Sequence, residues 1–375
     1  MTSAPSQLNP THVDIRAIER ELTNLWQSAA ESADSGRTSP VTRTCMANLV
    51  VVVDERGVAG RATQVIDRLT GVYPNRAIVT AALAHEGGTQ PEHAATIDAW
   101  VQAHCQLPAP GRPQVCGEQI TVEAHGEAAG RIPGVVLPLL VPDVPVALWL
   151  PHGEPARHPV AAKLTDIADR LIVNSATFAT PEASLPTLAG LIDADTGVSD
   201  LAWARLTGWR ELVAQFFDAP AMLPHLSEVE RIRLTVPSQP GQPSDRSQAL
   251  MLVGWLASRL GWKVAEHVGG ARLVRADGAE VALEIATADQ PDDQPDRLME
   301  VVIGCRRATF TVSRYPGADV AVTRAEVDGM RPIQRTARLE WLDEASLLAG
   351  ELQLLGRDRT FESALRVAAT LVATV

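Results

Sequence analysis

The residues best suited to bind an anion follow the first strongly apolar stretch of the sequence. The segment DERGVAG, Asp54 to Gly60, lies where a strand is predicted to pass through a turn into a helix. Backbone N–H groups at a helix start hold phosphate groups well when positive charge is near. The segment matches neither G-x-G-x-x-G nor G-x-x-x-x-G-K-[ST], and its two leading carboxylates would repel an anion. Two interpretations therefore stand, an ordinary turn or an anion site made by Arg56, Gly57, Gly60 and Arg61.

Cys105 and Cys116 are a second set of residues that could take part in a reaction. They flank the turn-rich segment PAPGRPQ, between two stretches, 97–107 and 115–124, that alternate apolar and polar residues. Period-two alternation around a short turn predicts an antiparallel hairpin, which brings the two cysteines to neighbouring or facing positions. A cross-strand disulfide that works as a redox pair is one interpretation, and two buried thiols are the other.

Other catalytic chemistry has no positive support in the sequence. The nine histidines show no metal spacing, and no G-x-S-x-G elbow is present. Glu118 and Glu123, on one predicted strand, are interpreted as a solvated sheet face rather than an acid–base pair. Trp149, Trp203 and Trp209 are either partner contacts or core residues. We predict no catalytic residue, no metal and no cofactor.

Charge and composition exclude several classes of partner. The 33 basic and 45 acidic residues give a net charge of −12, which opposes binding to nucleic acid. No stretch approaches the roughly 18 uninterrupted apolar residues that a membrane helix needs. The four cysteines lack both zinc spacing and the density of a secreted scaffold. These observations predict a soluble, cytoplasmic protein.

Hydrophobic patterning predicts two domains of different architecture. A first helix is predicted where Ile15, Ile18 and Leu22 recur at helical spacing, followed by a connector to about residue 40. Almost continuous apolar runs such as 45–53 and 144–150 are typical of strands covered on both faces. Shorter alternating runs after residue 280 are typical of an antiparallel sheet. A proline-rich segment, 237–247, resembles a linker or long loop.

The predicted fold class is α/β, with a mixed, mostly parallel sheet domain followed by a smaller α+β domain with antiparallel strands. We divide the chain into 1–40 (helix and connector), 41–226 (α/β domain) and 227–375 (α+β domain).

Several segments, in order along the chain, resemble the glucose-6-phosphate dehydrogenase assembly protein family, often called OpcA. The resemblance covers about residues 14 to 375, and no single motif in it is a chemical fingerprint. The matching segments are RTCMANLVVV from Arg43, VCGEQITVEAHG from Val115, LPLLVPDVPVALWLP from Leu137, DRLIVNSATF from Asp169, DLAWARLTGWRELVAQFFD from Asp200, LVGWLASRLGW from Leu252 and FESALRVAATL from Phe361.

The resemblance implies a non-catalytic partner that binds glucose-6-phosphate dehydrogenase, helps its oligomer assemble and raises its activity in the oxidative pentose phosphate pathway. It also implies thioredoxin control in some members through cysteines near the C-terminus. Here the second half of the chain holds only Cys305, so such control is in doubt or falls to Cys105 and Cys116. The rival hypotheses are an enzyme or sensor that binds a sugar phosphate or nucleotide at 54–61, and a scaffold for another partner.

Overall fold

The computed structural model describes ten stretches of the chain, which fall into two compact units. The stretches are 14–34, 41–83, 96–107, 113–192, 196–238, 244–267, 270–289, 298–315, 317–354 and 356–373. Unit 1 comprises Met1–Ala179, Thr196–Leu201 and Asp343–Gly356, and unit 2 comprises the remaining segments, Thr180–Asp195, Ala202–Leu342 and Arg357–Val375. These limits do not coincide with the predicted ranges 41–226 and 227–375, because the chain crosses between the units more than once.

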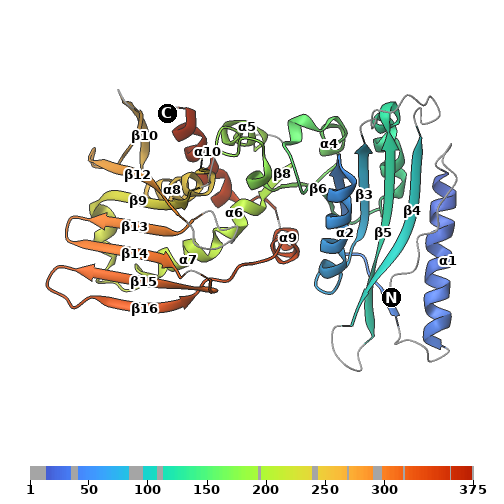
Figure 1. Ribbon diagram of the computed structural model, residues 1–375, viewed down its shortest axis with the longest axis horizontal. Helices are drawn as coiled ribbons and strands as arrows, with labels where there is room; N and C mark the ends of the chain where they lie inside the picture. The colour runs from blue at the N-terminus through green and yellow to red at the C-terminus, as the bar shows by residue number, and fades with distance from the viewer. Residues whose placement is uncertain are drawn as a thin grey trace. The chain divides into compact units, whose positions relative to one another are not determined.

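Unit 1 is built on a mostly parallel sheet, as the sequence predicted (Figure 1). In the described residues its strands run in the order β1-β5-β3-β2-β6-β7-β8, all parallel, and β4 also pairs with β5, as the antiparallel member. The strands are β1 (Val41–Arg43), β2 (Asn48–Val53), β3 (Arg76–Leu83), β4 (Ile97–Gln106), β5 (Gln114–His125), β6 (Val146–Leu150), β7 (Arg170–Val173) and β8 (Gly197–Asp200).

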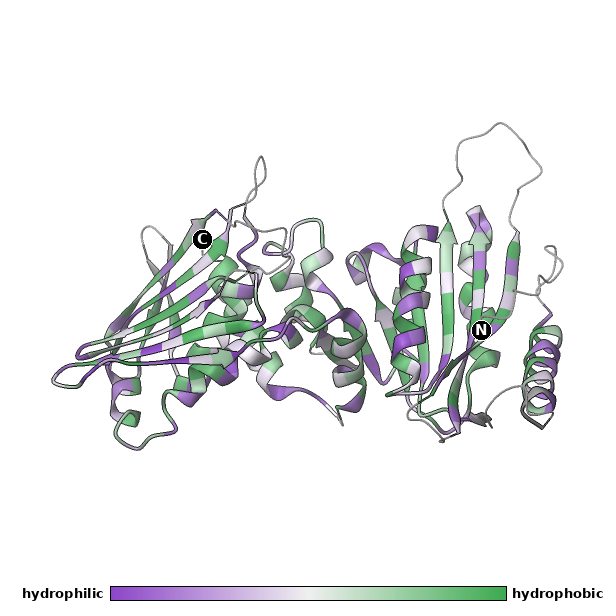
Figure 2. Cartoon of the chain, turned by 60° about the horizontal axis from the view of Figure 1, so that its bottom comes forward, coloured by the Kyte–Doolittle hydropathy of each residue, from purple (hydrophilic) through white to green (hydrophobic). Residues whose placement is uncertain are grey.

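Helices cover both faces of this sheet, which explains the continuous apolar runs of its central strands. Every residue of β2 is buried, and Figure 2 shows hydrophobic residues in green along these strands. The helices of unit 1 are α1 (Ile15–Asp34), α2 (Arg56–Thr70), α3 (Ile132–Val136), α4 (Pro159–Thr165) and α9 (Glu344–Gln353). The sheet of unit 1 lies between α1 and α2 (Figure 1), so adjacent residues of β5 point toward different helices.

Two predicted boundaries in unit 1 need correction. The connector predicted to run to about residue 40 is helical as far as Asp34, since its alanines and glutamate favour a helix. Residues 35–40 lie outside the described residues. The turn predicted over 54–60 is mostly helix, because α2 begins at Arg56. Its N-cap residue, Glu55, is extended and makes no side-chain capping bond.

Unit 2 is built on a mostly antiparallel sheet, which agrees with the predicted fold class. Its described strands run in the order β10-β11-β12-β9-β13-β14-β15-β16, with one parallel pair, β9 with β12. They are β9 (Val229–Pro237), β10 (Lys263–His267), β11 (Gly270–Val274), β12 (Glu280–Ala288), β13 (Glu300–Cys305), β14 (Ala308–Arg314), β15 (Val320–Val327) and β16 (Ile333–Arg338). The segment predicted as a linker, 237–247, joins β9 to the next helix, and its residues 239–243 lie outside the described residues.

The helices of unit 2 pack tightly against one another and the sheet. They are α5 (Leu185–Leu191), α6 (Leu201–Arg205, whose first residue belongs to unit 1), α7 (Thr207–Gln215), α8 (Ser247–Leu260) and α10 (Arg359–Ala373). α8 crosses α10 at Gly254, where an added Cβ would lie 2.2 Å from the backbone oxygen of Ala364. The stretch from Leu201 to Gln215 forms two helices rather than one, because α6 ends and α7 begins on either side of Leu206.

Candidate functional site

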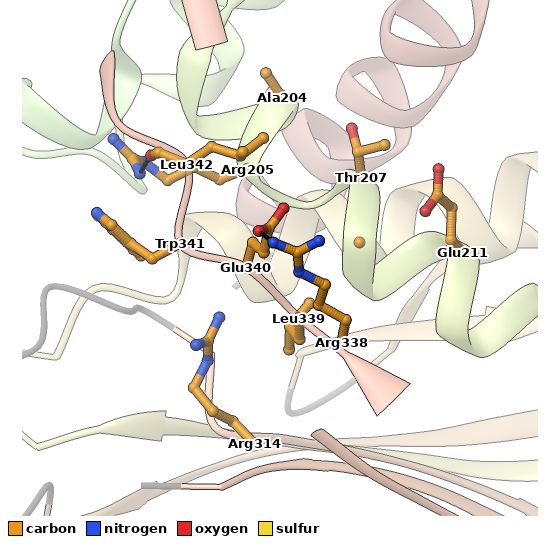
Figure 3. A pocket seen from close by; sticks show the side chains of 11 residues that line it. Ala204, Arg205, Thr207, Glu211, Arg314, Arg338, Leu339, Glu340, Trp341 and Leu342 are labelled. Atoms are coloured by element: carbon orange, nitrogen blue, oxygen red, sulfur yellow. Dashed lines mark hydrogen bonds and ion pairs between the residues drawn. The ribbon is translucent and has the colours of Figure 1, made fainter. Parts of the chain in front are cut away.

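A cavity of about 400 Å³ opens in unit 2 beside α6, α7 and the end of β16 (Figure 3). Its lining combines guanidinium groups, carboxylates, a hydroxyl and an indole. The polar lining comes from Arg205, Thr207, Glu211, Arg314, Arg338 and Trp341, with Glu340 beside them. We call this cavity with its lining the arginine pocket.

The floor of the arginine pocket depends on a close approach between α7 and the strand end. Leu339 follows β16 and is only 3% exposed. A Cβ added at Gly208, in the first turn of α7, would lie 2.7 Å from the Cδ1 atom of Leu339. Glycine at 208 therefore lets the helix meet Leu339 without displacing it.

Arg205 is held in place by two contacts within unit 2. Its guanidinium carbon lies 4.1 Å from the ring centroid of Trp341, a cation–π distance. Its Nη1 atom donates a 2.9 Å hydrogen bond to the backbone oxygen of Leu342. The guanidinium is thus oriented before any ligand arrives.

The other two arginines of the arginine pocket come from strand ends. Arg314 closes β14 and Arg338 closes β16, and Figure 3 shows both side chains extending to the side of the cavity where Glu340 and Trp341 lie. Arg338 forms an ion pair with Glu340. Three arginines and two glutamates give this lining a formal charge of +1, whereas the whole chain carries −12. The arginine pocket is therefore a locally positive place on an acidic protein.

Unit 1 holds a second group of arginines and carboxylates, and its central pair, Arg76 and Glu118, is buried. Glu118 of β5 accepts a 2.5 Å hydrogen bond from Nε of Arg76 and a 3.0 Å bond from Nη2 of Arg43. The indole N–H of Trp26 donates to Glu118 Oε2 over 2.8 Å, and Arg76 Nη1 donates to Glu19 over 3.0 Å. These five residues, the Glu118 cluster, join α1 to β1, β3 and β5. The prediction that Glu118 lies on a solvated face is wrong, because Glu118 is 3% exposed.

The electrostatics of the Glu118 cluster favour an ionised carboxylate at neutral pH. Burial by itself raises the pKa of Glu118, but the charge of Arg76 and the hydrogen bonds from Arg43, Trp26 and Arg76 together outweigh it, so the pKa is lowered. A carboxylate with this many donors holds a helix in place and is a poor proton carrier. Neighbouring Gln119 points to the other face, where its Nε2 bonds Thr63 of α2 over 2.9 Å.

Cys105 and Cys116, the predicted pair, are joined in a disulfide. They are directly opposite each other in the β4–β5 hairpin, with Cys105 exposed and Cys116 buried. The other two thiols are poor nucleophiles: burial raises the pKa of Cys45, and burial followed by the charges of Glu228 and Glu230 raises the pKa of Cys305 to about 12. Whether the disulfide has a redox function stays a prediction.

The predicted anion site has a different geometry from the one expected. Gly57 and Gly60 lie inside α2 rather than in a turn. Arg56 forms a 3.1 Å ion pair with Glu123. The carboxylate of Glu123 neutralises the positive charge that would attract an anion to Arg56. The Nη1 atom of Arg61 lies 3.7 Å from where a Cβ at Gly57 would be. Anion binding at Arg56, Gly57, Gly60 and Arg61 therefore remains a prediction.

The three tryptophans considered as partner contacts are buried. Trp149, Trp203 and Trp209 are 0%, 1% and 3% exposed. The indole N–H of Trp203 donates to Asp358 over 3.0 Å, and its ring lies 5.7 Å from that of Phe361 within unit 2. These side chains have the core-packing role that was the alternative from the sequence, so in this conformation a docking surface must be made by other residues.

Comparison with known proteins identifies the family. A family model described as the glucose-6-phosphate dehydrogenase subunit N-terminal domain matches residues 66–190, and one described as the C-terminal domain of the same subunit matches residues 196–365. Both models carry the OpcA name, and they follow each other in the expected order. The chain belongs to the OpcA family.

Two OpcA relatives with provisional names as OxPP cycle proteins align with most of the chain. The relative from Nostoc punctiforme is 25% identical over 440 residues, which covers 96% of this chain and 94% of the relative. The relative from Synechococcus elongatus is 30% identical over 301 residues, which covers 73% of this chain and 64% of the relative.

Among solved structures, the OpcA chain resembles oxidoreductases only distantly. A crystal structure of a KijD10 mutant, a 3-ketoreductase from Actinomadura kijaniata, is 14% identical with a TM-score of 0.45, over 88% of this chain and 96% of that one. A likeness at this level carries no conclusion about activity.

Sequence reasoning missed both charged groups of this OpcA chain. Trp26, Arg43, Arg76 and Glu118 are spread over about ninety residues, and only the register of the sheet brings them together. In the described residues, no three His, Cys, Asp or Glu side chains gather as a metal site would require. None of the helices within the described ranges combines the length and apolar character needed to cross a membrane.

Proposed function

We propose that this chain is a non-catalytic assembly factor and allosteric activator of glucose-6-phosphate dehydrogenase. The observation that carries the proposal is the consecutive match of two subunit-domain family models over residues 66–190 and 196–365. The names of the relatives, which refer to the OxPP cycle, support a place in the oxidative pentose phosphate pathway. We place the dehydrogenase and this partner together in the cytoplasm.

Activation by a binding partner requires a difference in affinity between two states of the enzyme. A partner that binds the active conformation or oligomer more tightly shifts the population toward it, and one that binds both states equally changes nothing. We propose that the chain binds the active form of the dehydrogenase more tightly.

The chemistry of the described groups favours a partner over an enzyme. The carboxylate of Glu118 is saturated by three donor side chains, and the two free thiols have raised pKa values. Neither arrangement suits a general acid or a nucleophile.

We also propose that thioredoxin, or a similar dithiol reductase, acts on the Cys105–Cys116 disulfide. The sulfur of Cys105 lies on an exposed residue, which a thiolate can reach, while Cys116 is buried. Attack on the Cys105 sulfur would break the disulfide and form a mixed disulfide. The second thiol of the reductase would then resolve it, leaving two cysteine thiols here and a disulfide on the reductase.

The alternative function is an enzyme or sensor that binds a sugar phosphate or nucleotide at 54–61. The exposed start of α2 favours it, and the ion pair of Arg56 with Glu123 opposes it. Turnover of a pathway metabolite by this chain alone would support this alternative.

The decisive experiment mixes the purified chain with the dehydrogenase of the same organism. We expect the two to co-elute on size exclusion and the rate at limiting glucose 6-phosphate to rise with the amount of chain added. A dehydrogenase from an unrelated source is the control for nonspecific stabilisation. Separate elution together with unchanged kinetics would contradict the proposal.

A further inference from the structure

We propose that the arginine pocket of unit 2 binds the monophosphate ester of a sugar. This inference goes beyond the proposed function and does not depend on it, since the ligand would bind the chain itself. It also differs from the anion site predicted at 54–61, which lies in unit 1. The size of the cavity, the kinds of side chain around it and the way they are held all favour such a ligand.

The cationic part of the lining suits one phosphate group. Arg205, Arg314 and Arg338 come from three separate elements and line one cavity. A guanidinium presents planar N–H donors that match two phosphate oxygens at once, which makes arginine a specific phosphate ligand. Arg205 is already oriented by Trp341 and by the backbone oxygen of Leu342, so less side-chain freedom is lost on binding.

The remaining lining suits sugar hydroxyl groups. Carboxylate oxygens of Glu211 and Glu340 accept hydrogen bonds from hydroxyls, and the hydroxyl of Thr207 can donate or accept. The indole of Trp341 adds an apolar surface at the cavity wall. A site that held inorganic phosphate alone would have no use for two carboxylates, because they repel it.

Size and charge favour a small anion over a larger one. The cavity, at about 400 Å³, falls toward the small end of the range of about 300 to 1,000 Å³ that is usual for ligand sites. A formal lining charge of +1 matches one phosphate better than the several charges of a nucleoside triphosphate. The net charge of the chain, −12, adds a long-range repulsion that grows with the charge of the ligand.

The test is isothermal titration of the full chain with glucose 6-phosphate, glucose and inorganic phosphate. We expect saturable binding of glucose 6-phosphate with a Kd below about 1 mM, and weaker binding of both glucose and phosphate. No saturable heat with glucose 6-phosphate at millimolar concentration would overturn the proposal. Equal affinity for glucose or for phosphate alone would overturn the assigned ligand class.

Three variants test whether the ligand binds in the arginine pocket. Arg205→Gln and Arg338→Gln should each weaken glucose 6-phosphate binding by about tenfold, or about 1.4 kcal/mol. Arg338 is on an exposed strand edge, so its replacement should leave the fold intact, which the thermal midpoint checks. Arg324→Gln is the matched control, because Arg324 is an exposed arginine of β15 that pairs with Glu326 and does not line the cavity. An equal loss in the control would show nonspecific charge attraction and overturn the site.

Glu211→Gln tests separately whether this carboxylate contacts the sugar part of the ligand. Removing this carboxylate should strengthen binding of inorganic phosphate and narrow the preference for glucose 6-phosphate over phosphate. An unchanged preference would show that Glu211 does not face the sugar and would overturn this orientation. Dehydrogenase binding, measured by co-elution, is a separate readout, so failure of either proposal can be recognised without the other.

Discussion

The Glu118 cluster of unit 1 and the arginine pocket of unit 2 use the same residue types for opposite purposes. Each contains arginines, glutamates and one tryptophan. In the cluster the side chains of Arg76 and Glu118 are 7% and 4% exposed. In the pocket Arg338 is 77% exposed and lines an open cavity. Solvent access, rather than residue type, distinguishes charged side chains that stabilise the fold from charged side chains that can bind a ligand.

The difference follows from the cost of burying a charge. A buried ion must be fully paired, because an unpaired charge in the protein interior costs several kcal/mol. The Glu118 cluster meets this condition with three donor side chains on one carboxylate. In the pocket Arg338 faces water, so its pair with Glu340 can be looser and can be exchanged for a ligand.

Breaking the Glu118 cluster should have the largest effect. Glu118→Ala leaves Arg76 buried without its nearest carboxylate, and we expect the free energy of unfolding of unit 1 to fall by about 3 to 5 kcal/mol. Thermal unfolding and hydrogen exchange in α1 would measure this, because α1 is tied to the sheet through Glu118.

The matched control for this change is Glu123→Ala on the same strand. Glu123 pairs with Arg56, whose side chain is 61% exposed, and such a pair contributes about 0 to 1 kcal/mol. Equal losses for the two variants would remove the distinction between buried and exposed charge.

Opening the disulfide next to the cluster should have the second largest effect. Cys116 is opposite Arg43 in the β1–β5 pairing, and the disulfide spans a sequence separation of 11. By loop entropy, Cys105→Ser should cost about 2 to 3 kcal/mol. Cys45→Ser, at a free thiol, is the control. Alkylation followed by mass spectrometry checks the disulfide itself, and two alkylated cysteines at 105 and 116 without reductant would contradict it.

The pH dependence of the Glu118 cluster offers a third comparison. Because the pKa of Glu118 is lowered in the folded state, its contribution to stability is complete above the ordinary glutamate pKa of about 4.3 and is lost as the pH falls through the lower folded value. The difference in thermal midpoint between wild type and Glu118→Gln should therefore shrink below about pH 4. A difference that stays constant from pH 7 to acid would contradict this assignment.

The smallest effect on stability is expected in the arginine pocket. Arg338→Gln removes an exposed ion pair with Glu340, and we expect a change within about 0.5 kcal/mol in the free energy of unfolding. Denaturant titration of the two proteins side by side measures it. A loss as large as that of Glu118→Ala would mean that Arg338 is structural, and the contrast between the two groups would disappear.

Local pattern was enough for much of the fold. The all-apolar run before Asp54 predicted a strand covered on both faces, and every residue of β2 is buried. The alternating run from Val320 to Val327 is a strand over the same residues. Periodicity does not show a helix break that depends on packing, such as the break at Leu206 between α6 and α7. It also does not show that a helix such as α9 belongs to unit 1.

The sequence by itself determined the mostly parallel and mostly antiparallel sheets, the hairpin that brings Cys105 close to Cys116, and the family resemblance. These depend on neighbours along the chain, because the side-chain period of a strand or helix is visible in a short window. Only the tertiary structure decided that Glu118 is buried and paired while Arg338 lines an open cavity. Burial and charge pairing depend on residues that are distant in the chain, and no local period records which of them will meet.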